Sequence, residues 1–412
     1  MKTVVKNIGL LATARGKEAR KGREQGEIQQ IAGTYIVIID GRIATVGGEH
    51  TAPDPMICED ATIIDAGGAL VTPGLVDAHT HLLFAGWRQK ELALKLQGVS
   101  YLEILKQGGG ILHTVNATRR ATPADLVAAG QESLGRMLRH GTTTCEVKSG
   151  YGLTVEDELK SLAAVRELNG LQPVDLVATF MGAHAIPVEY QNRQQEYVRL
   201  VCDEMIPAVA EQQLAVFCDV FCEDHVFNLA ESGEILACGR RYGLLPKIHA
   251  DEITPLGGAA LAGEVRAVSA EHLIYADDKG LAKMAASGTV AVLLPGTSFY
   301  LGEDFARARA MVEMGIPVAI ATDFNPGSCP NESLQLPMNL ACLKYRLTPA
   351  EVLTAVTLNG AAALCCAHDR GTVEEGKAGD LVIWQAPDLE FLFYHWGVNL
   401  VKTVIKGGEP VL

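Results

Sequence analysis

The chain has 412 residues, of which 48% are hydrophobic, and a formal net charge of −14. A chain of this length can bury a large core, and α/β barrels of more than about 200 residues form single domains. The acidic balance argues against nucleic acid or an anionic membrane as a partner, because both bind basic protein surfaces. It also means that an anionic substrate requires a local arginine or lysine.

The N-terminal residues do not have the pattern of a targeting segment. Lys6 and Arg15 interrupt the only apolar stretch there, and no apolar run elsewhere approaches the ~20 residues of a membrane span. Ten cysteines in a chain of this length are too few for a disulfide scaffold, so we expect buried free thiols rather than a cysteine zinc site. We therefore expect a cytoplasmic protein.

Both ends of the chain have the pattern of short β-strands. Apolar runs at 35–39 and 43–46 flank the turn dipeptide Asp40-Gly41, which is the signature of a hairpin. Runs at 380–384 and 401–405 repeat the pattern near the other end. Because each flank is too small to form a core alone, we predict one β-sandwich domain from residues 1–67 and 371–412.

Between these flanks, eight apolar strand-like runs alternate with helical patterns. The runs cover residues 75–78, 142–147, 176–181, 216–221, 246–249, 267–269, 290–294 and 318–321. Continuous apolar strands separated by helices predict a parallel sheet that is buried on both faces. We therefore predict a TIM-like (β/α)8 barrel over residues 68–370, with an open doubly wound sheet as the alternative fold.

Two helix starts are explicit in the sequence. Thr122 and Thr348 each precede a proline and have an acidic residue three positions later, Asp125 and Glu351 respectively. A capping threonine, proline at the first helical position and an acid at the third are typical of a helix N-terminus. We expect helices to begin at both places.

Metal-competent side chains follow the strand runs at the ends where a barrel enzyme carries its catalytic groups. They are His79 and His81 after the first run, His184 after the third, His249 and Glu252 after the fifth, His272 after the sixth and Asp323 after the eighth. The two-residue spacing of His79 and His81 directs both imidazoles to one side of a strand. Together with His249 and Asp323, they form a ligand set that suits zinc or iron and leaves a position for water.

The expected number of metal ions follows from the fourth run. A second metal normally requires a bridging carboxylate-type ligand, and Phe221-Cys222-Glu223-Asp224 contains no lysine that carbamylation could convert into one. Glu223 is the alternative bridging ligand. We predict one metal ion per chain, Zn²⁺ or Fe²⁺/Fe³⁺.

Several segments resemble those of a known enzyme family. LVTPGLVDAHTHLLFAG (70–86) resembles the metal-binding opening of the amidohydrolase superfamily. The fuller set is similar to the imidazolonepropionase family: AGWR (85–88), GGGI (108–111), EVKSGYGL (146–153), GAHAIP (182–187), KIHADE (247–252) and ATDFNPGS (321–328). The resemblance covers nearly the whole barrel, and Trp87 and Cys329 are local variations in it.

The resemblance implies a zinc- or iron-dependent enzyme of histidine degradation that hydrolyses 4-imidazolone-5-propanoate to N-formimidoyl-L-glutamate. It implies the metal ligands His79, His81, His249 and Asp323. It also implies a substrate pocket lined by Arg88, Tyr151, His184, Glu252, Asn325, Gly327 and Ser328.

The residue types suit this chemistry. Hydrolysis of a ring amide requires an activated water, a group that stabilises the oxyanion and a proton for the leaving nitrogen. Asp323 can bind the metal and accept the proton of water, His272 or His184 can stabilise the oxyanion, and Glu252 can deliver a proton to the ring nitrogen. The division of roles between His272 and Glu252 stays open at this point.

Arg88 distinguishes the hypothesis of an imidazolone hydrolase, whose substrate carries a carboxylate, from two alternative functions. It lies seven residues beyond His81, and its planar guanidinium can bind a substrate carboxylate through two hydrogen bonds. A purine or cytosine deaminase shares the metal ligands but needs no cation for a carboxylate. A metal-binding scaffold without catalysis is the third hypothesis, and the acids and histidine that flank the ligands argue against it. We expect a small-molecule substrate, no nucleic-acid or membrane partner, and a homodimer.

Overall fold

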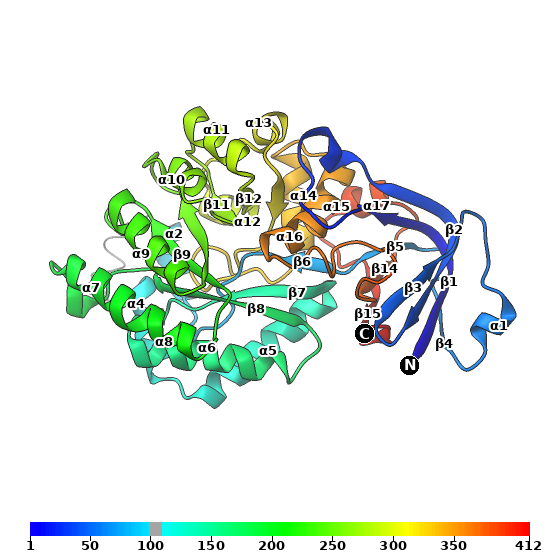
Figure 1. Ribbon diagram of the computed structural model, residues 1–412, viewed down its shortest axis with the longest axis horizontal. Helices are drawn as coiled ribbons and strands as arrows, with labels where there is room; N and C mark the ends of the chain where they lie inside the picture. Colours follow the sequence, from blue (N-terminus) through cyan, green and yellow to red (C-terminus); the bar gives the residue numbers. More distant parts are fainter. Residues whose placement is uncertain (99–108) are drawn as a thin grey trace.

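The computed structural model describes residues 1–98 and 109–412. Figure 1 shows a barrel on the left and a smaller β domain on the right, with both chain termini in the β domain. Four helices lie between the two parts: α14 (Gln335–Leu343), α15 (Pro349–Ala355), α16 (Leu358–Ala363) and α17 (Leu389–Tyr394).

The barrel is built from eight parallel strands that pair in chain order. They are β6 (Leu75–Asp77), β7 (Thr142–Lys148), β8 (Asp175–Ala183), β9 (Phe217–Cys222), β10 (Leu245–Ala250), β11 (Ser269–His272), β12 (Val290–Leu293) and β13 (Val318–Ile320). The first and last strands meet just beyond their ends, where the amide of Asp323 donates to His79 O at 3.0 Å and the amide of His81 to Phe324 O at 2.9 Å. This closure confirms the predicted barrel and excludes the open sheet.

Helices cover the outside of the barrel, because helical segments follow the strands along the chain. Those in the described ranges are α2 (Glu91–Leu96), α4 (Ile111–Arg120), α5 (Pro123–Arg139), α6 (Val155–Asn169), α7 (Gln194–Leu200), α8 (Ile206–Glu211), α9 (Leu229–Arg241), α10 (Gly258–Glu264), α11 (Asp278–Ser287), α12 (Pro295–Leu301) and α13 (Ala308–Glu313). The two predicted helix starts are confirmed, since Thr122 and Thr348 form capping boxes with Asp125 and Glu351.

The β domain combines the two ends of the chain, as predicted. Its strands are β1 (Lys2–Thr13), β2 (Gln29–Ile39), β3 (Arg42–Val46), β4 (Thr62–Asp65), β5 (Leu70–Pro73), β14 (Leu381–Trp384), β15 (Val401–Lys406) and β16 (Glu409–Pro410). Asp40 and Gly41 form the hairpin turn between β2 and β3, both with positive φ.

The strands of this domain are continuous in one mixed sheet, because β5 pairs with β1 on one side and with β14 on the other. The sheet has a buried apolar cluster of its own that includes Val5, Ile36 and Leu381. β5 follows residue 67, so the sheet extends beyond the predicted end of the first segment. The division of the chain at 67/68 and 370/371 stays a prediction.

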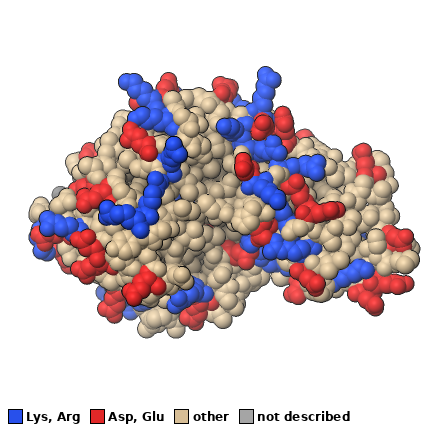
Figure 2. All heavy atoms as spheres, viewed as in Figure 1, with Lys and Arg blue, Asp and Glu red and all other residues tan. Residues whose placement is uncertain are grey.

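The surface of the molecule carries charges of both signs. Acidic and basic side chains are interspersed on the face shown in Figure 2. None of the described helices is long and apolar enough to cross a membrane. All ten cysteines are free, as expected, but only six of them are buried, and Cys365 is exposed.

Candidate active site and metal centre

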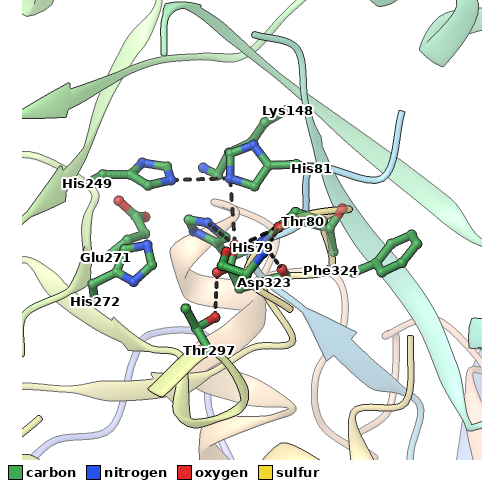
Figure 3. A network of polar contacts seen from close by, with 12 residues as sticks. His79, Thr80, His81, Lys148, His249, Glu271, His272, Thr297, Asp323 and Phe324 are labelled. Atoms are coloured by element: carbon green, nitrogen blue, oxygen red, sulfur yellow. Dashed lines mark hydrogen bonds and ion pairs between the residues drawn. The ribbon is translucent and has the colours of Figure 1, made fainter. Parts of the chain in front are cut away.

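Four imidazoles and one carboxylate form a buried cluster at the carboxyl ends of the barrel strands (Figure 3). The cluster consists of His79 and His81 beyond β6, His249 in β10, His272 at the end of β11 and Asp323 beyond β13. The side chains come together because parallel strands present their carboxyl ends at the same rim of the barrel. The sequence predicted each of these positions at a strand end.

The nitrogen and oxygen atoms of the cluster converge on a common region. The Nε2 atoms of His79 and His81 lie 3.4 and 3.7 Å from Asp323 Oδ1. The Nε2 atoms of His81 and His249 are 3.3 Å apart. Two overlapping sets of ligand atoms each lie within 4.8 Å of one another: His79, His81 and Asp323, and His79, His249 and His272. The described residues therefore include one histidine–carboxylate group and one group of three histidines that are each able to hold a metal ion.

The hydrogen bonding and the protonation state of His79 and His81 are those of metal ligands. Both ring nitrogens of His79 and Nδ1 of His81 are buried without a hydrogen-bond partner among the described residues. Leaving a buried polar atom unsatisfied costs about 1–3 kcal/mol, so such atoms are rare unless a ligand or ion satisfies them. Burial lowers the pKa of both His79 and His81, aided by Lys148 and by neighbouring histidines. Both imidazoles are therefore neutral, which is the form that binds metals.

Asp323 is oriented by its neighbours and by its backbone. Its φ of 54° lies in the left-handed region, where a residue other than glycine is strained, as functional residues often are. Thr297 Oγ1 donates to Oδ2 at 2.5 Å, which leaves Oδ1 facing His79 and His81. Burial raises the pKa of Asp323 to about 6, although the hydrogen bond from Thr297 opposes this rise.

Glu252 and His272 form a pair at the edge of the cluster. Glu252 Oε2 lies 3.3 Å from His272 Nε2. Burial, and secondarily the Asp323 carboxylate, raises the pKa of Glu252 to about 8. Burial and the proximity of His249 lower the pKa of His272. At neutral pH the pair therefore consists of a protonated carboxyl group and a neutral imidazole, so Glu252 has a proton to donate.

The rings of His184 and Tyr151 lie beside the cluster of histidines and Asp323. The ring of His184 stacks on His81 with centroids 4.7 Å apart, and its Nδ1 lies 3.0 Å from Gly150 O. Burial lowers the pKa of His184 to about 3, so this imidazole is neutral as well. The ring of Tyr151 lies 5.2 Å from that of His184 and 6.0 Å from that of His81. Both residues thus border the cluster, and their contact with a substrate stays a prediction.

Arg88 forms an ion pair with Glu91, a partner that the sequence did not identify. Its Nε donates to both carboxylate oxygens of Glu91 at 3.0 Å, and its Nη2 donates to Oε2 at 2.9 Å. Glu91 Oε1 also accepts from the Gly110 amide at 2.7 Å. This hydrogen bond connects the first residue of α2 to the residue that precedes α4. The first residue of that motif, Gly108, lies outside the described residues. A Cβ atom at Gly327 would lie 2.1 Å from Arg88 Nη1, so any side chain there would displace the guanidinium from its present position.

Asn325 and Ser328 determine the shape of the loop between Asp323 and Gly327. Asn325 Oδ1 accepts from the amides of Gly327 at 2.8 Å and Ser328 at 2.7 Å. Its Nδ2 donates to Asp323 O at 2.7 Å and lies 2.9 Å from Ser328 Oγ. The loop therefore links Asp323 to the position of Arg88. Direct contact of Asn325 or Ser328 with a substrate stays a prediction.

Two acids that follow strands do not point into the cluster. Asp251 accepts hydrogen bonds from the backbone amides of residues 257–259. Glu223 accepts from the amide of Ile253 at 2.8 Å and also binds Thr254. Both carboxylates accept hydrogen bonds from neighbouring loops. The alternative role of Glu223 as a bridging metal ligand therefore finds no support.

A layer of buried charges beneath the cluster was also missed. It consists of Glu146, Lys148, Asp219, Lys247 and Glu271, all fully buried. The sequence contained a sign of this layer, because these charged residues interrupt apolar strands. They occupy alternate positions that face the barrel interior. Lys247, for example, lies two residues before His249 on β10.

The chain is similar in sequence and in fold to known proteins. The model of the amidohydrolase family matches residues 70–411. An imidazolonepropionase from Alkaliphilus oremlandii is 52% identical over 99% of this chain and 97% of its own length, and one from Bacillus velezensis is 50% identical over 100% and 97%.

Solved structures share the fold at lower identity. A triazine hydrolase variant superposes with a TM-score of 0.77 at 17% identity, covering 100% of this chain and 94% of its own. The 5-methylcytosine deaminase from Klebsiella pneumoniae gives a TM-score of 0.73 at 21% identity, covering 98% of both chains. The match to the family model and the full-length similarity to imidazolonepropionases establish that the chain belongs to the amidohydrolase family.

Proposed function

We propose that this protein catalyses the imidazolonepropionase reaction, the hydrolysis of 4-imidazolone-5-propanoate to N-formimidoyl-L-glutamate. The observation that carries the proposal is the 50–52% identity to imidazolonepropionases over essentially the whole chain. The site supports it independently, because the ligand cluster, the Glu252–His272 pair and an arginine occur together.

The proposed cofactor is one metal ion, Zn²⁺ or iron, held by His79, His81, His249 and Asp323. When bound, it would act as a Lewis acid that makes water a nucleophile near neutral pH. A second candidate group, formed by Asp219, His249 and Glu271, already contains a cation, because Lys148 Nζ lies 2.7 Å from Asp219 Oδ2. That ammonium group favours a single metal over two.

The protein groups supply the proton transfers. Asp323 accepts a proton from the attacking water, whose oxygen forms a bond to the ring carbonyl carbon. His272 or His184, both neutral, donates a hydrogen bond to the oxyanion. Glu252 gives its proton to the ring nitrogen as the carbon–nitrogen bond breaks. The raised pKa of Glu252 keeps this proton available at neutral pH.

Substrate recognition is assigned to the loops around the cluster. Arg88 would bind the propanoate carboxylate, and Gly327 provides the space for its guanidinium. Tyr151 and His184 would pack against the ring of the substrate. Asn325 and Ser328 would hold the loop that places Gly327 beside Arg88.

The function is tested by turnover with purified protein that has never been exposed to chelator. We expect hydrolysis of 4-imidazolone-5-propanoate and no comparable deamination of cytosine or guanine. Preferential deamination would replace the proposal with the deaminase hypothesis. Absence of turnover on all three compounds would support a scaffold.

The roles of the ligands and of the acid are separable by mutation. Elemental analysis should find close to one zinc or iron per chain, and His79→Ala should lose most of it. Glu252→Gln should retain the metal and lose turnover, because the amide cannot donate the same proton. A near-normal rate in Glu252→Gln would refute the proton-transfer role.

We also propose a cytoplasmic location and a homodimer. The ten free thiols support a reducing compartment. Tyr394 and Trp396 are 83% and 60% exposed, and aromatic side chains of this kind are enriched in interfaces. Sedimentation of the wild-type protein and of Tyr394→Ser/Trp396→Ser tests the dimer, which a monomeric wild type would contradict.

A further inference from the structure

His249 differs from the other proposed metal ligands in the environment of its second ring nitrogen. His249 Nδ1 lies 3.1 Å from Asp219 Oδ2 and 3.2 Å from Asp219 Oδ1. The Nδ1 atoms of His79 and His81 have no hydrogen-bond partner among the described residues. Within the described part of the chain, His249 is thus the only one of the three proposed histidine ligands whose second ring nitrogen contacts a carboxylate.

This contact selects a tautomer of His249. An ionised carboxylate only accepts hydrogen bonds, so the neutral His249 ring that binds a metal carries its single proton on Nδ1. The lone pair is then on Nε2, the atom that lies 3.3 Å from His81 Nε2 within the ligand cluster. A carboxylate behind a metal-binding imidazole both fixes the ring orientation and makes the nitrogen that binds the metal more basic.

Asp219 is itself held in place by two donors. Lys148 Nζ lies 2.7 Å from Oδ2, and the Val220 amide donates to Oδ1 at 2.7 Å. Lys148 is in turn fixed by Glu146, whose Oε2 is 2.9 Å away. The side chains of Asp219, Lys148 and Glu146 are 0% exposed, so water does not compete for these bonds.

The connection crosses the barrel interior from strand to strand. Lys148 is the last residue of β7, Asp219 lies in β9 and His249 lies in β10. Figure 3 shows Lys148 close behind the imidazoles that face Asp323. The orientation of His249 is therefore set by side chains of two other strands as well as by its own rotamer.

We propose that Asp219 is a positioning residue of the metal centre. It holds His249 with Nε2 directed at the metal, and Lys148 anchors the carboxylate that does so. This inference rests on the proposed function, since it requires that His249 binds a metal. The competing explanation is that Asp219 only balances the charge of buried Lys148.

The two explanations differ in what a carboxylate-to-amide change does to metal affinity. Asp219→Asn should weaken zinc binding about 10–100-fold in competition with a chromophoric chelator. Glu146→Gln is the matched control, because Glu146 is equally buried and also binds Lys148 but does not contact His249. It should change zinc affinity much less, even where it lowers stability. Equal weakening in both variants would mean that Asp219 acts only through charge balance.

A double variant keeps the proposal testable if Asp219→Asn does not fold. Removing Asp219 alone leaves Lys148 charged and poorly paired, which is strongly destabilising in a buried site. Asp219→Asn/Lys148→Met removes both charges and should show the same loss of zinc affinity. Wild-type affinity in a folded Asp219 variant would overturn the proposal.

The wild-type protein gives a direct check. In protein labelled with ¹⁵N-histidine and loaded with zinc, nitrogen chemical shifts should place the His249 proton on Nδ1. A proton on Nε2 would overturn the proposal without any mutation. The metal site itself is tested separately with His249→Ala: if this variant binds zinc as tightly as the wild type, the proposed ligand set fails, and not merely the role of Asp219.

Discussion

The ion pair between Arg88 and Glu91 determines how the guanidinium of Arg88 is oriented. The guanidinium is oriented by Glu91 through Nε and Nη2, while Nη1 lies toward Gly327. A buried cation needs such a partner, because an uncompensated charge in a low-dielectric site is costly. Glu91 therefore holds the guanidinium of Arg88 in one orientation, and we propose that it is in this orientation that Arg88 binds a substrate carboxylate.

Removal of Arg88 should weaken substrate binding specifically. We expect Arg88→Ala to lower kcat/KM for 4-imidazolone-5-propanoate by about 2–4 kcal/mol, mainly through KM, because a charge-assisted pair is lost. Metal content should not change. Steady-state kinetics and elemental analysis measure both effects.

The control for Arg88 is a substrate analogue that lacks the carboxylate. The wild type should process it poorly, and Arg88→Ala should lose little further activity on it. If the mutation impairs both compounds equally, Arg88 has a structural role and another group holds the carboxylate. Arg88→Lys should recover only part of the activity, because an ammonium group cannot form the same two parallel hydrogen bonds.

Among the elements, α15 illustrates how local sequence and tertiary contacts combine. Thr348 and Glu351 form its capping box, and Arg309 binds the same carboxylate at 2.9 and 2.7 Å. Burial tends to raise the pKa of Glu351, but the bonds from Arg309 and Thr348 outweigh it and hold the pKa below the usual value. The ionised form of Glu351 therefore stabilises the folded protein.

The contribution of Glu351 should depend on pH. We expect Glu351→Gln to lower the free energy of unfolding at pH 7 by about 1 kcal/mol or less, because glutamine can keep the capping box but loses the negative charge at the helix N-terminus and the ion pair with the partly exposed Arg309. A depressed pKa gives stability that is fully present above the unfolded value, and that is lost as pH falls through the folded value. The difference between variant and wild type should therefore shrink in acid.

Denaturant unfolding at pH 7 and at successively lower pH measures this effect. Glu409→Gln is a suitable control, because Glu409 is exposed at the edge of the β domain. A Glu351→Gln deficit that is independent of pH would show that the carboxylate charge contributes nothing.

At the scale of the whole molecule, the proposed metal ligands come from distant parts of the barrel. His79 and His81 follow β6, His249 lies in β10 and Asp323 follows β13, at the seam where the barrel closes. A ligand that binds only the folded state stabilises it by about 2.7 kcal/mol at a concentration 100-fold above its Kd. The metal should therefore stabilise the closed barrel.

Metal removal is accordingly expected to lower the Tm. Thermal unfolding of chelator-treated protein should occur at lower temperature, and added zinc should restore the Tm in a concentration-dependent manner. His79→Ala should show little response to zinc. An identical Tm with and without metal would contradict binding at the barrel seam.

Much of this organisation was predictable because it depends on local patterns. The apolar runs located the barrel strands, although the sixth run, 267–269, overlaps β11 only at Ser269. The proline and threonine signals located two helix starts, and Asp40-Gly41 marked the hairpin. His79, His81, His249 and Asp323 were identifiable as a group because parallel strands bring their carboxyl ends to one rim. Such arguments need only the period of a strand and the order of the elements.

Other features depended on the tertiary structure, because they require the register between strands and the closure of the barrel. Spacing along the chain does not reveal that Asp219 of β9 meets His249 of β10, or that β5 joins the two halves of the β domain. Nor does it distinguish an acid that faces the site, such as Glu252, from one that staples a loop, such as Asp251. These contacts are decided by distances between residues that are remote in sequence, which only the packed barrel establishes.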